Sequence, residues 1–212
     1  MPNSESQHVA RPRSPQDFDS YYESQAPWDL GRPQKVFESL LRSGQAAGSF
    51  LDVGCGTGEH ALLAAELGHA STGVDASARA IEMARQKART RQLDVSFLCA
   101  DVLNWSPAQR FDAVLDCGFF HGLTDHDRQV WAETLKGLAA DGCRYFMLAF
   151  SSDHPGDLGP RRLTVNEIAD WFHGLGWTIT HTSPRTYERI GHLPAAGILT
   201  IAQAPGRSSP PE

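Results

Sequence analysis

The feature that most constrains the fold is an alternation, from residue 49 to residue 202, between short apolar segments and segments with helical periodicity. Strand-like patterns cover residues 49–53, 70–74, 95–100, 111–117 and 143–150. Helical patterns lie among them at residues 59–67, 78–91, 127–139 and 165–175. Strands that are joined through helices run parallel, because each crossover returns the chain to the same edge of the sheet.

The last part of the chain departs from this alternation. Two further strand patterns, residues 177–183 and 195–202, are separated by a short connection that contains proline and glycine. We therefore expect these two strands to form an antiparallel hairpin. Together the patterns predict an α/β fold with a doubly wound, mostly parallel, seven-stranded sheet and a C-terminal antiparallel hairpin.

The two ends of the chain differ in composition from this central region. Residues 1–16 and 204–212 are rich in Pro, Ser and Arg. Such segments cannot bury enough apolar surface to offset the entropy lost on ordering. We therefore expect disordered tails on either side of a single domain, residues 17–203.

Composition also limits the partners and the compartment. The 19 basic and 25 acidic residues give a net charge of −6, and no run of Lys or Arg forms a stripe, so nucleic acid is an unfavourable partner. The four cysteines lack a CxxC spacing, which is typical of reduced, cytoplasmic proteins. No apolar run approaches the roughly 18 residues of a membrane span, so we expect no membrane anchor and no secretion. No pattern indicates the oligomeric state.

The most specific motif joins the first strand to the first helix and reads Leu51-Asp52-Val53-Gly54-Cys55-Gly56-Thr57-Gly58. Its glycines permit positive φ angles and close approach of a ligand to the backbone. A nicotinamide-dinucleotide fingerprint would place glycine where this chain has Glu59. The spacing instead resembles the D-x-G-x-G-x-G motif of class I S-adenosylmethionine-dependent methyltransferases, which have a Rossmann-like fold. The resemblance implies that S-adenosylmethionine is the cofactor and that the loop holds its amino-acid end through Asp52, Gly54, Cys55, Gly56, Thr57 and Gly58.

Three further acids lie at the ends of successive predicted strands, where an open α/β sheet binds its ligand. Asp75, with Ala76 after it, resembles the family residue that accepts hydrogen bonds from both ribose hydroxyls; the alternative is a helix-start carboxylate. Asp101 resembles the position beside the adenine amino group, with Val102 flanking the ring; the alternative is a solvated loop acid. Asp116 lies at the end of the fourth strand, where the family places the transferable methyl group.

An aromatic segment precedes the first strand. Its Pro27-Trp28-Asp29-Leu30-Gly31-Arg32-Pro33 portion resembles the N-terminal lid of thiol, thiopurine and halide methyltransferases, and of related bacterial enzymes that methylate quinols and toxic heterocycles. The resemblance implies a lid at residues 17–33 in which Trp28 packs beside the cofactor methionine; the alternative is a tryptophan that only anchors the loop. Tyr21 and Tyr22 either close over the substrate or are ordinary residues of an amphipathic helix.

Other subclasses of methyltransferase lack support. The segment after Asp116 is not the D/N-P-P-Y/F motif of nucleic-acid amino methyltransferases, and there is neither an acidic hairpin for a guanidinium substrate nor a clear trio of magnesium ligands. His121, Asp125, His126 and Asp127 resemble metal ligands superficially, but polar clusters at a helix start are usually caps. We therefore predict no metal.

Candidate residues for binding the methyl acceptor are those that follow the fourth strand. Phe119 and Phe120 are candidates to line the acceptor pocket, although residues at this spacing are equally typical of a core. A phenol must lose its proton before it can accept a methyl group, so a base is useful at neutral pH. His121 is the candidate base with Asp116 as the nearby carboxylate; the alternatives are a histidine bonded only to backbone and a thiolate acceptor that needs no base. His60 is expected to orient the glycine-rich loop.

Taken together, the sequence predicts an enzyme that transfers a methyl group in line to oxygen, sulfur or nitrogen of a small aromatic or heterocyclic molecule, in detoxification or quinone-like metabolism. Two alternatives remain open at this point. A nucleotide-binding oxidoreductase shares the strand, glycine loop and helix, and a non-catalytic module that binds S-adenosylmethionine shares all the cofactor residues.

Overall fold

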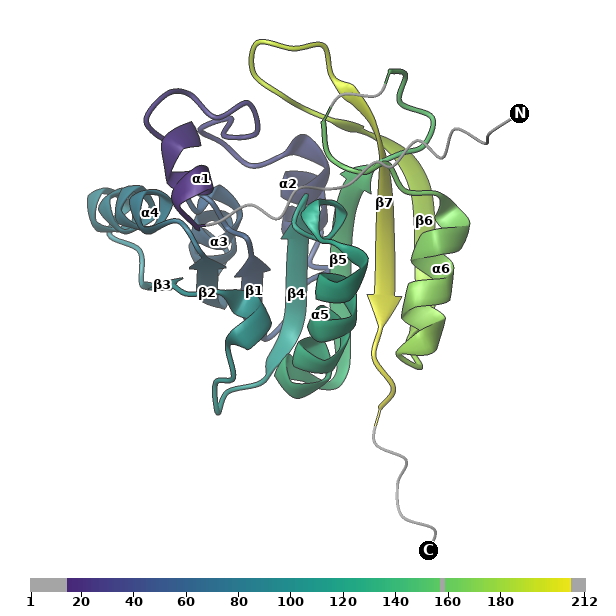
Figure 1. The fold of residues 1–212 in the computed structure, drawn as a ribbon. Helices are drawn as coiled ribbons and strands as arrows, with labels where there is room; N and C mark the ends of the chain where they lie inside the picture. Colours follow the sequence, from purple (N-terminus) through teal and green to yellow (C-terminus); the bar gives the residue numbers. More distant parts are fainter. Residues whose placement is uncertain (1–14, 157–158, 207–212) are drawn as a thin grey trace, which may run out of the picture.

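The computed structural model describes residues 15–156 and 159–206, and a seven-stranded sheet forms its centre (Figure 1). The strands are β1 (Ser49–Val53), β2 (Ala70–Asp75), β3 (Val95–Cys99), β4 (Phe111–Cys117), β5 (Ala139–Phe150), β6 (Thr178–Tyr187) and β7 (Ala195–Gln203). Their order is β3-β2-β1-β4-β5-β7-β6. The pairs from β3 to β5 are parallel, whereas β7 is antiparallel to both β5 and β6. The predicted fold class, including the C-terminal hairpin, is confirmed.

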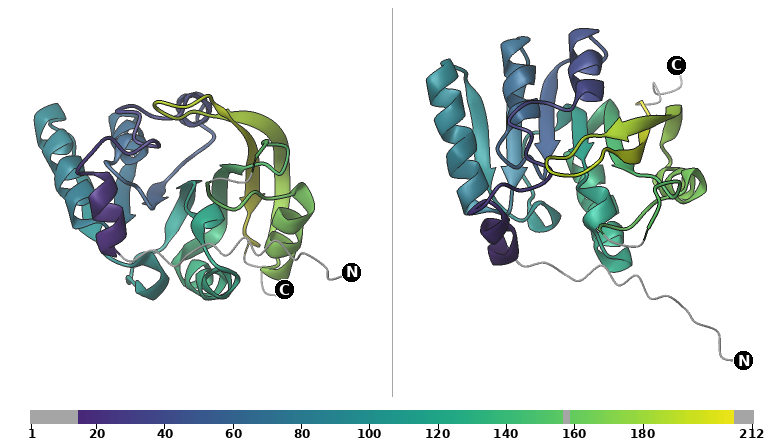
Figure 2. Two further views of the ribbon diagram at one scale, coloured as in Figure 1. Left: turned by 45° about the horizontal axis from the view of Figure 1, so that its top comes forward. Right: turned by 90° about the horizontal axis from the view of Figure 1, so that it is seen from above.

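Helices cover both faces of this sheet (Figure 2). They are α1 (Pro15–Tyr21), α2 (Lys35–Arg42), α3 (Glu59–Glu66), α4 (Ala78–Arg91), α5 (Asp125–Leu138) and α6 (Val165–Gly174), with short 3-10 turns η1 (Val102–Asn104) and η2 (Phe120–Gly122). Apolar residues of α5 and α6 pack on one face of the central strands, and those of α2 and α3 pack on the other. Because helices bury both faces of the sheet, the parallel strands are apolar along their length. This is the origin of the short apolar segments that alternate with helical segments in the sequence.

The register of the parallel strands brings the predicted site residues to one edge. Val53 at the end of β1 pairs with Val74 on one side and with Asp116 on the other. Asp75 pairs with Cys99, which lies two residues before Asp101. The glycine-rich loop and the three acids therefore lie side by side at the carboxyl edge of the sheet, where α/β folds bind ligands.

Two helices and parts of two strands were not predicted. α1 and α2 are only 7 and 8 residues long, and α2 buries just Phe37 and Leu41, which is too short a repeat for a periodicity to be recognised. β5 begins at Ala139 rather than at residue 143, because the ladder with β4 continues across an irregularity near Phe111. β6 continues to Tyr187, past the proline that marked its predicted end.

The domain also extends slightly beyond its predicted limits. Pro15 begins α1, and Ala204 is buried and donates its backbone N–H to the carbonyl of Cys143 at 2.8 Å. Residues 15, 16 and 204 therefore belong to the folded part of the chain. The rest of the two predicted tails lies outside the described residues, apart from residues 205 and 206. Over the described ranges, no helix is long and apolar enough to cross a membrane.

Candidate active site at the carboxyl edge of the sheet

The glycine-rich loop has the backbone conformation that its sequence predicts. Gly56 and Gly58 have φ angles of +53° and +85°. A Cβ atom at Gly56 would lie 2.8 Å from the Tyr22 hydroxyl, and one at Gly58 would lie 2.6 Å from the ring of Phe97. Only glycine therefore permits the loop to approach both the lid and the sheet so closely. The side chain of Cys55 points to the buried core beside Phe97, so its backbone alone forms part of the loop surface.

Asp75 connects the loop to the end of β2. One carboxylate oxygen accepts the backbone N–H of Gly56 at 2.8 Å, and the other accepts that of Ser77 at 2.8 Å. Burial raises the pKa of Asp75, whereas these two hydrogen bonds oppose that rise. Asp75 is half-buried at the edge, as is Ala76 beside it. It is therefore placed where a ligand that carries hydroxyl groups can reach it.

Asp52 lies beneath the loop and not on its surface. It is 1% exposed, and its carboxylate accepts the backbone N–H of Ala61 in the first turn of α3 at 3.3 Å. His60 Nδ1 lies 3.9 Å from this carboxylate, and its Nε2 accepts the backbone N–H of Gln34 at 3.2 Å. Burial lowers the pKa of His60 to about 4, so the ring is neutral at neutral pH. Asp52 and His60 thus hold the loop, the start of α3 and the lid together.

The segment before β1 covers the glycine-rich loop. The Trp28 indole N–H donates to the Tyr22 hydroxyl at 3.0 Å, and the Trp28 ring lies 4.9 Å from that of Tyr21. The Thr57 hydroxyl donates to the carboxylate of Asp29 at 2.8 Å. Tyr22 is buried against the loop, whereas Tyr21 and Trp28 are half-buried. The lid therefore reaches the cofactor loop through Tyr22 and Asp29.

A second covering segment, residues 188–194 between β6 and β7, was not recognised in the sequence. Arg32 of the lid makes two hydrogen bonds with the carboxylate of Glu188, at 2.8 and 3.2 Å. The side-chain amide of Gln34 both donates to and accepts from the backbone of Glu188, at 2.9 and 3.0 Å. The Ile190 N–H donates to the carbonyl of Pro27 at 2.8 Å. The two segments are thus joined over the carboxyl edge, as their positions in Figure 1 also show.

Asp101 lies at the end of β3 and is exposed. Its carboxylate caps η1 by accepting the backbone N–H of Leu103 at 3.0 Å and the side-chain amide of Asn104 at 2.7 Å. Val102 is buried in the main core at 5% exposure. The alternative considered for Asp101 was a solvated loop acid, and the structure adds that this exposed acid caps η1.

Asp116 is fully buried at the end of β4. It accepts the backbone N–H groups of Phe119 at 2.8 Å and Phe120 at 3.1 Å, and the Tyr145 hydroxyl at 2.7 Å. Burial raises its pKa to about 6, and these hydrogen bonds limit the rise. Since both oxygens are engaged by protein groups, Asp116 holds the turn that carries His121.

His121 lies in that turn and is 5% exposed. Its Nδ1 accepts the backbone N–H of Phe150 at 3.0 Å, so in the neutral ring the proton is on Nε2. Burial, and secondarily the charge of Arg128, lowers the pKa of His121 to about 3. The Nε2 edge faces the backbone of Gly118, where an added Cβ atom would lie 3.1 Å from Nε2 and 2.4 Å from the Tyr187 hydroxyl.

The two phenylalanines of this turn differ in placement. Phe119 is half-buried beside the glycine-rich loop, where a Cβ atom added at Gly54 would lie 3.2 Å from it. Phe120 is 2% exposed, and its ring lies 4.5 Å from Trp171 and 4.6 Å from the Arg128 guanidinium. Phe119 is therefore brought to the site, whereas Phe120 belongs to the core between α5 and α6.

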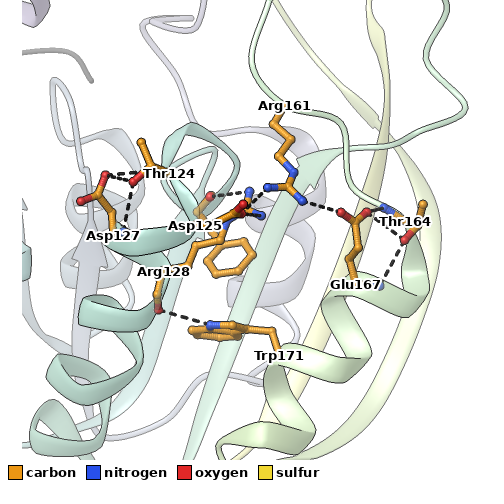
Figure 3. Close-up of polar contacts among 9 residues, drawn as sticks. Thr124, Asp125, Asp127, Arg128, Arg161, Thr164, Glu167 and Trp171 are labelled. Carbon is orange, nitrogen blue, oxygen red and sulfur yellow. Dashed lines mark hydrogen bonds and ion pairs between the residues drawn. The ribbon is translucent and has the colours of Figure 1, made fainter. Parts of the chain in front are cut away.

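The polar side chains at the starts of α5 and α6 form one helix cap on each helix (Figure 3). Thr124 and Asp127 form a capping box on α5, as Thr164 and Glu167 do on α6. Arg161 bonds to both Asp125 and Glu167 and so links the two helix starts. Over residues 15–156 and 159–206, no group of three or more potential ligands is placed to hold a metal ion.

Comparison with known proteins agrees with this geometry. A family described as "Methyltransferase domain" matches residues 50–142. The 2-heptyl-1-hydroxyquinolin-4(1H)-one methyltransferase of Mycobacteroides abscessus is 32% identical over 79% of this chain and 78% of that protein. A probable thiol methyltransferase of Arabidopsis thaliana is 32% identical over 71% of this chain and 68% of that protein.

The fold has solved counterparts. A structure from work on the conversion of a disulfide bond into a thioacetal group during echinomycin biosynthesis is 30% identical, covers 91% of this chain and 94% of that chain, and has a TM-score of 0.79. More distant structures of the same fold contain S-adenosylmethionine or its demethylated product, S-adenosylhomocysteine.

Proposed function

Because this chain belongs to the class I S-adenosylmethionine-dependent methyltransferases that act on small molecules, we propose that it methylates an oxygen, sulfur or nitrogen atom of a flat aromatic or heterocyclic acceptor. S-adenosylmethionine is its cofactor. The hydroxyquinolone and thiol named for the two relatives support this class of acceptor.

The observation that carries the proposal is the glycine-rich loop with its lid. Gly54 is exposed beside Phe119, Gly56 lies close under the Tyr22 hydroxyl, and Asp75 lies at the same edge, where it accepts the Gly56 N–H. An amino-acid end, a pair of hydroxyls and a sulfonium fit such a set of backbone N–H groups, a carboxylate and aromatic faces. We assign the amino-acid end to the loop, the ribose to Asp75 and the adenine to Asp101 with Val102. We also assign Trp28 a position beside the sulfonium.

Chemistry at this site depends mainly on alignment. The bound cofactor supplies an activated methyl group, and its neutral sulfur leaves without a proton. The chain has to hold the acceptor in line and exclude water, which can account for about 7–11 kcal/mol of the barrier. The two joined covering segments, residues 17–33 and 188–194, are suited to exclude water, and Phe119 to contact the acceptor.

Glu59 explains why a dinucleotide is unfavourable at this loop. This acid is 6% exposed at the start of α3 and pairs with Lys87 at 2.8 Å and with Arg91 at 2.9 Å. A dinucleotide fingerprint needs its third glycine at this position, and Glu59 with its two partners on α4 stands in its place. The family assignment replaces the oxidoreductase considered from the sequence.

Further features belong to the same proposal. Four free cysteines support a reducing, cytoplasmic compartment, and the acidic net charge supports a partner other than nucleic acid. Methylation of heterocycles is consistent with detoxification. We also propose that residues 17–203, together with the flanking residues 15, 16 and 204, form one catalytic domain.

The test is mass spectrometry of phenols, thiols and nitrogen heterocycles after incubation with the protein and isotopically labelled S-adenosylmethionine. A labelled methyl group on any acceptor is the expected result. Calorimetric binding of S-adenosylhomocysteine without transfer to any acceptor would instead identify a non-catalytic binding module. Absence of cofactor binding would overturn the assignment of the loop.

A further inference from the structure

The donor and acceptor roles at His121 determine what kind of acceptor the site can use. The Nδ1 lone pair is committed to the Phe150 N–H at 3.0 Å, and the proton is therefore on Nε2. Among the described residues, no hydrogen bond is made by Nε2. A neutral imidazole in this state can donate a hydrogen bond from Nε2 but has no free lone pair for a substrate proton.

The neighbours of His121 do not supply a base either. Asp116 is engaged by two backbone N–H groups and the Tyr145 hydroxyl. The Tyr187 hydroxyl donates to the carbonyl of Cys117 at 3.3 Å, and burial raises the pKa of the Cys117 thiol. His154 lies on the far side of Phe150 and accepts the backbone N–H of Ala196 at 3.3 Å.

Charges of both signs lie near this point: Arg128 and Arg161 are positive, and the acids Asp116, Asp125 and Glu167 act on Arg128 from the other side of the balance. Arg128 in the first turn of α5 is 7% exposed, and its Nε has no hydrogen-bond partner in the structure. Its charge is among the causes that keep His121 unprotonated, and it is close enough to Asp116 for an electrostatic interaction. The Nε2–H of His121 is a donor without a partner among the described residues, and a donor of this kind bonds more strongly to an acceptor that carries a negative charge than to a neutral one.

We propose that His121 is a hydrogen-bond donor and not a base, and that the enzyme selects acidic acceptors, which bind as anions through Nε2–H. This rests on the proposed methyltransferase function. The acceptor loses its proton to solvent before it binds. Its lone pair then forms the bond to the methyl carbon while the carbon–sulfur bond breaks, and the electron pair of that bond remains on sulfur. No proton has to move within the site.

The binding test uses chromogenic acids whose neutral and anionic forms differ in their absorption spectra. 4-Nitrophenol, 4-nitrothiophenol and 1-hydroxy-2-pyridinethione are titrated into the protein saturated with S-adenosylhomocysteine, across pH. Affinity should rise as each probe ionises, with an inflection that moves with the pKa of the probe. Preferential binding of the neutral acids, or no saturable binding of any of the three probes, would overturn the proposal.

Two substitutions separate the donor from the base. In His121→Asn, the side chain can still accept the Phe150 N–H, but it has no group at the Nε2 position. In His121→Gln, the side chain places an amide N–H at that position and cannot act as a base. We expect His121→Asn to weaken anion binding about 10- to 100-fold, and His121→Gln to remain within a few-fold of the wild type. Tyr187→Phe is the matched control and should keep the preference for the anion, because its hydroxyl is bonded to backbone.

Kinetics with any acceptor that the protein methylates give an independent check. The nucleophile loses charge in the transition state, so loss of a donor should raise KM and leave kcat unchanged or higher. Loss of a general base would lower kcat by about 10²–10⁴ in both variants. Such a loss in His121→Gln, with thermal stability and S-adenosylhomocysteine binding retained, would overturn the proposal. Failure of methyl transfer itself is seen separately, since it leaves the pH dependence of probe binding intact.

Discussion

The two halves of the carboxyl edge are built differently. Beside β1, β2 and β3, the acids Asp75 and Asp101 remain accessible, and both also organise backbone N–H groups. Beside β4 and β5, Asp116 and His121 are almost completely buried and bonded to protein groups, with Nε2 of His121 as the exception noted above. The first half therefore presents polar acceptors to a ligand, one on the half-buried Asp75 and one on the exposed Asp101. The second half fixes its shape internally and presents few polar groups to an acceptor.

We call the edge beside β1, β2 and β3 the cofactor half, and the edge beside β4 and β5 the acceptor half. The largest effect of a substitution should come from the cofactor half. Replacement of Asp75 by Ala removes a charged acceptor that also holds Gly56, so we expect the dissociation constant of S-adenosylhomocysteine to rise about 100-fold or more. Asp101→Ala, at an exposed turn, should raise it about tenfold or less. Calorimetry on both variants measures these changes. Equal affinities for Asp75→Ala and the wild type would remove Asp75 from the cofactor site.

In the acceptor half, Asp116→Asn should act mainly on stability. Asn keeps one acceptor oxygen but loses the charge, so at least one of the N–H groups of Phe119 and Phe120 becomes poorly satisfied in a buried place. We expect a loss of about 2–3 kcal/mol in the free energy of unfolding in urea. Tyr145→Phe, which removes a single partner of the same carboxylate, should cost about 1 kcal/mol. A stable Asp116→Asn protein without transferase activity would instead show that Asp116 takes part in the chemistry.

Each half contains one buried histidine, and the pair predicts how acid affects folding. Burial lowers the pKa of His60 to about 4 and that of His121 to about 3, below the ordinary value of about 6.5. The unfolded chain therefore takes up the proton first, and stability falls as pH drops below about 6.5. At pH 5 each histidine should account for about 2 kcal/mol of this loss.

Asn at either position removes its share of this acid sensitivity. The difference between the unfolding free energies at pH 7.5 and pH 5 should shrink by about 2 kcal/mol in His60→Asn and in His121→Asn. Below pH 4 the unfolding free energies of the two variants should diverge. His60 becomes protonated in the folded protein near pH 4, whereas His121 does not until about pH 3. Variants with the acid sensitivity of the wild type would show that the ring concerned is not buried in the neutral form.

The same division explains what could be predicted from the sequence. Glycine spacing and strand-end acids are local patterns, so the loop from Gly54 to Gly58 and the position of Asp75 were found without the structure. The partners of His121 were not, because Phe150 and Tyr187 are far from it in sequence and reach it only through the order of β4, β5, β7 and β6. The segment that carries Glu188 is a short polar connection whose role depends on a contact with Arg32, 156 residues away.

The smallest effect should come from the ion pair that joins the covering segments of the two halves. Arg32 is 45% exposed and Glu188 17% exposed, so the coupling energy between them in a double-mutant cycle of Arg32→Ala and Glu188→Ala should be only about 0.5–1 kcal/mol. The ion pair nevertheless orients both segments, because the Glu188 carboxylate also accepts the backbone N–H of Lys35 at 3.1 Å. We therefore expect faster release of S-adenosylhomocysteine, by a few-fold, in stopped-flow measurements on either single variant. Release at the wild-type rate, together with zero coupling, would show that the two halves are covered independently.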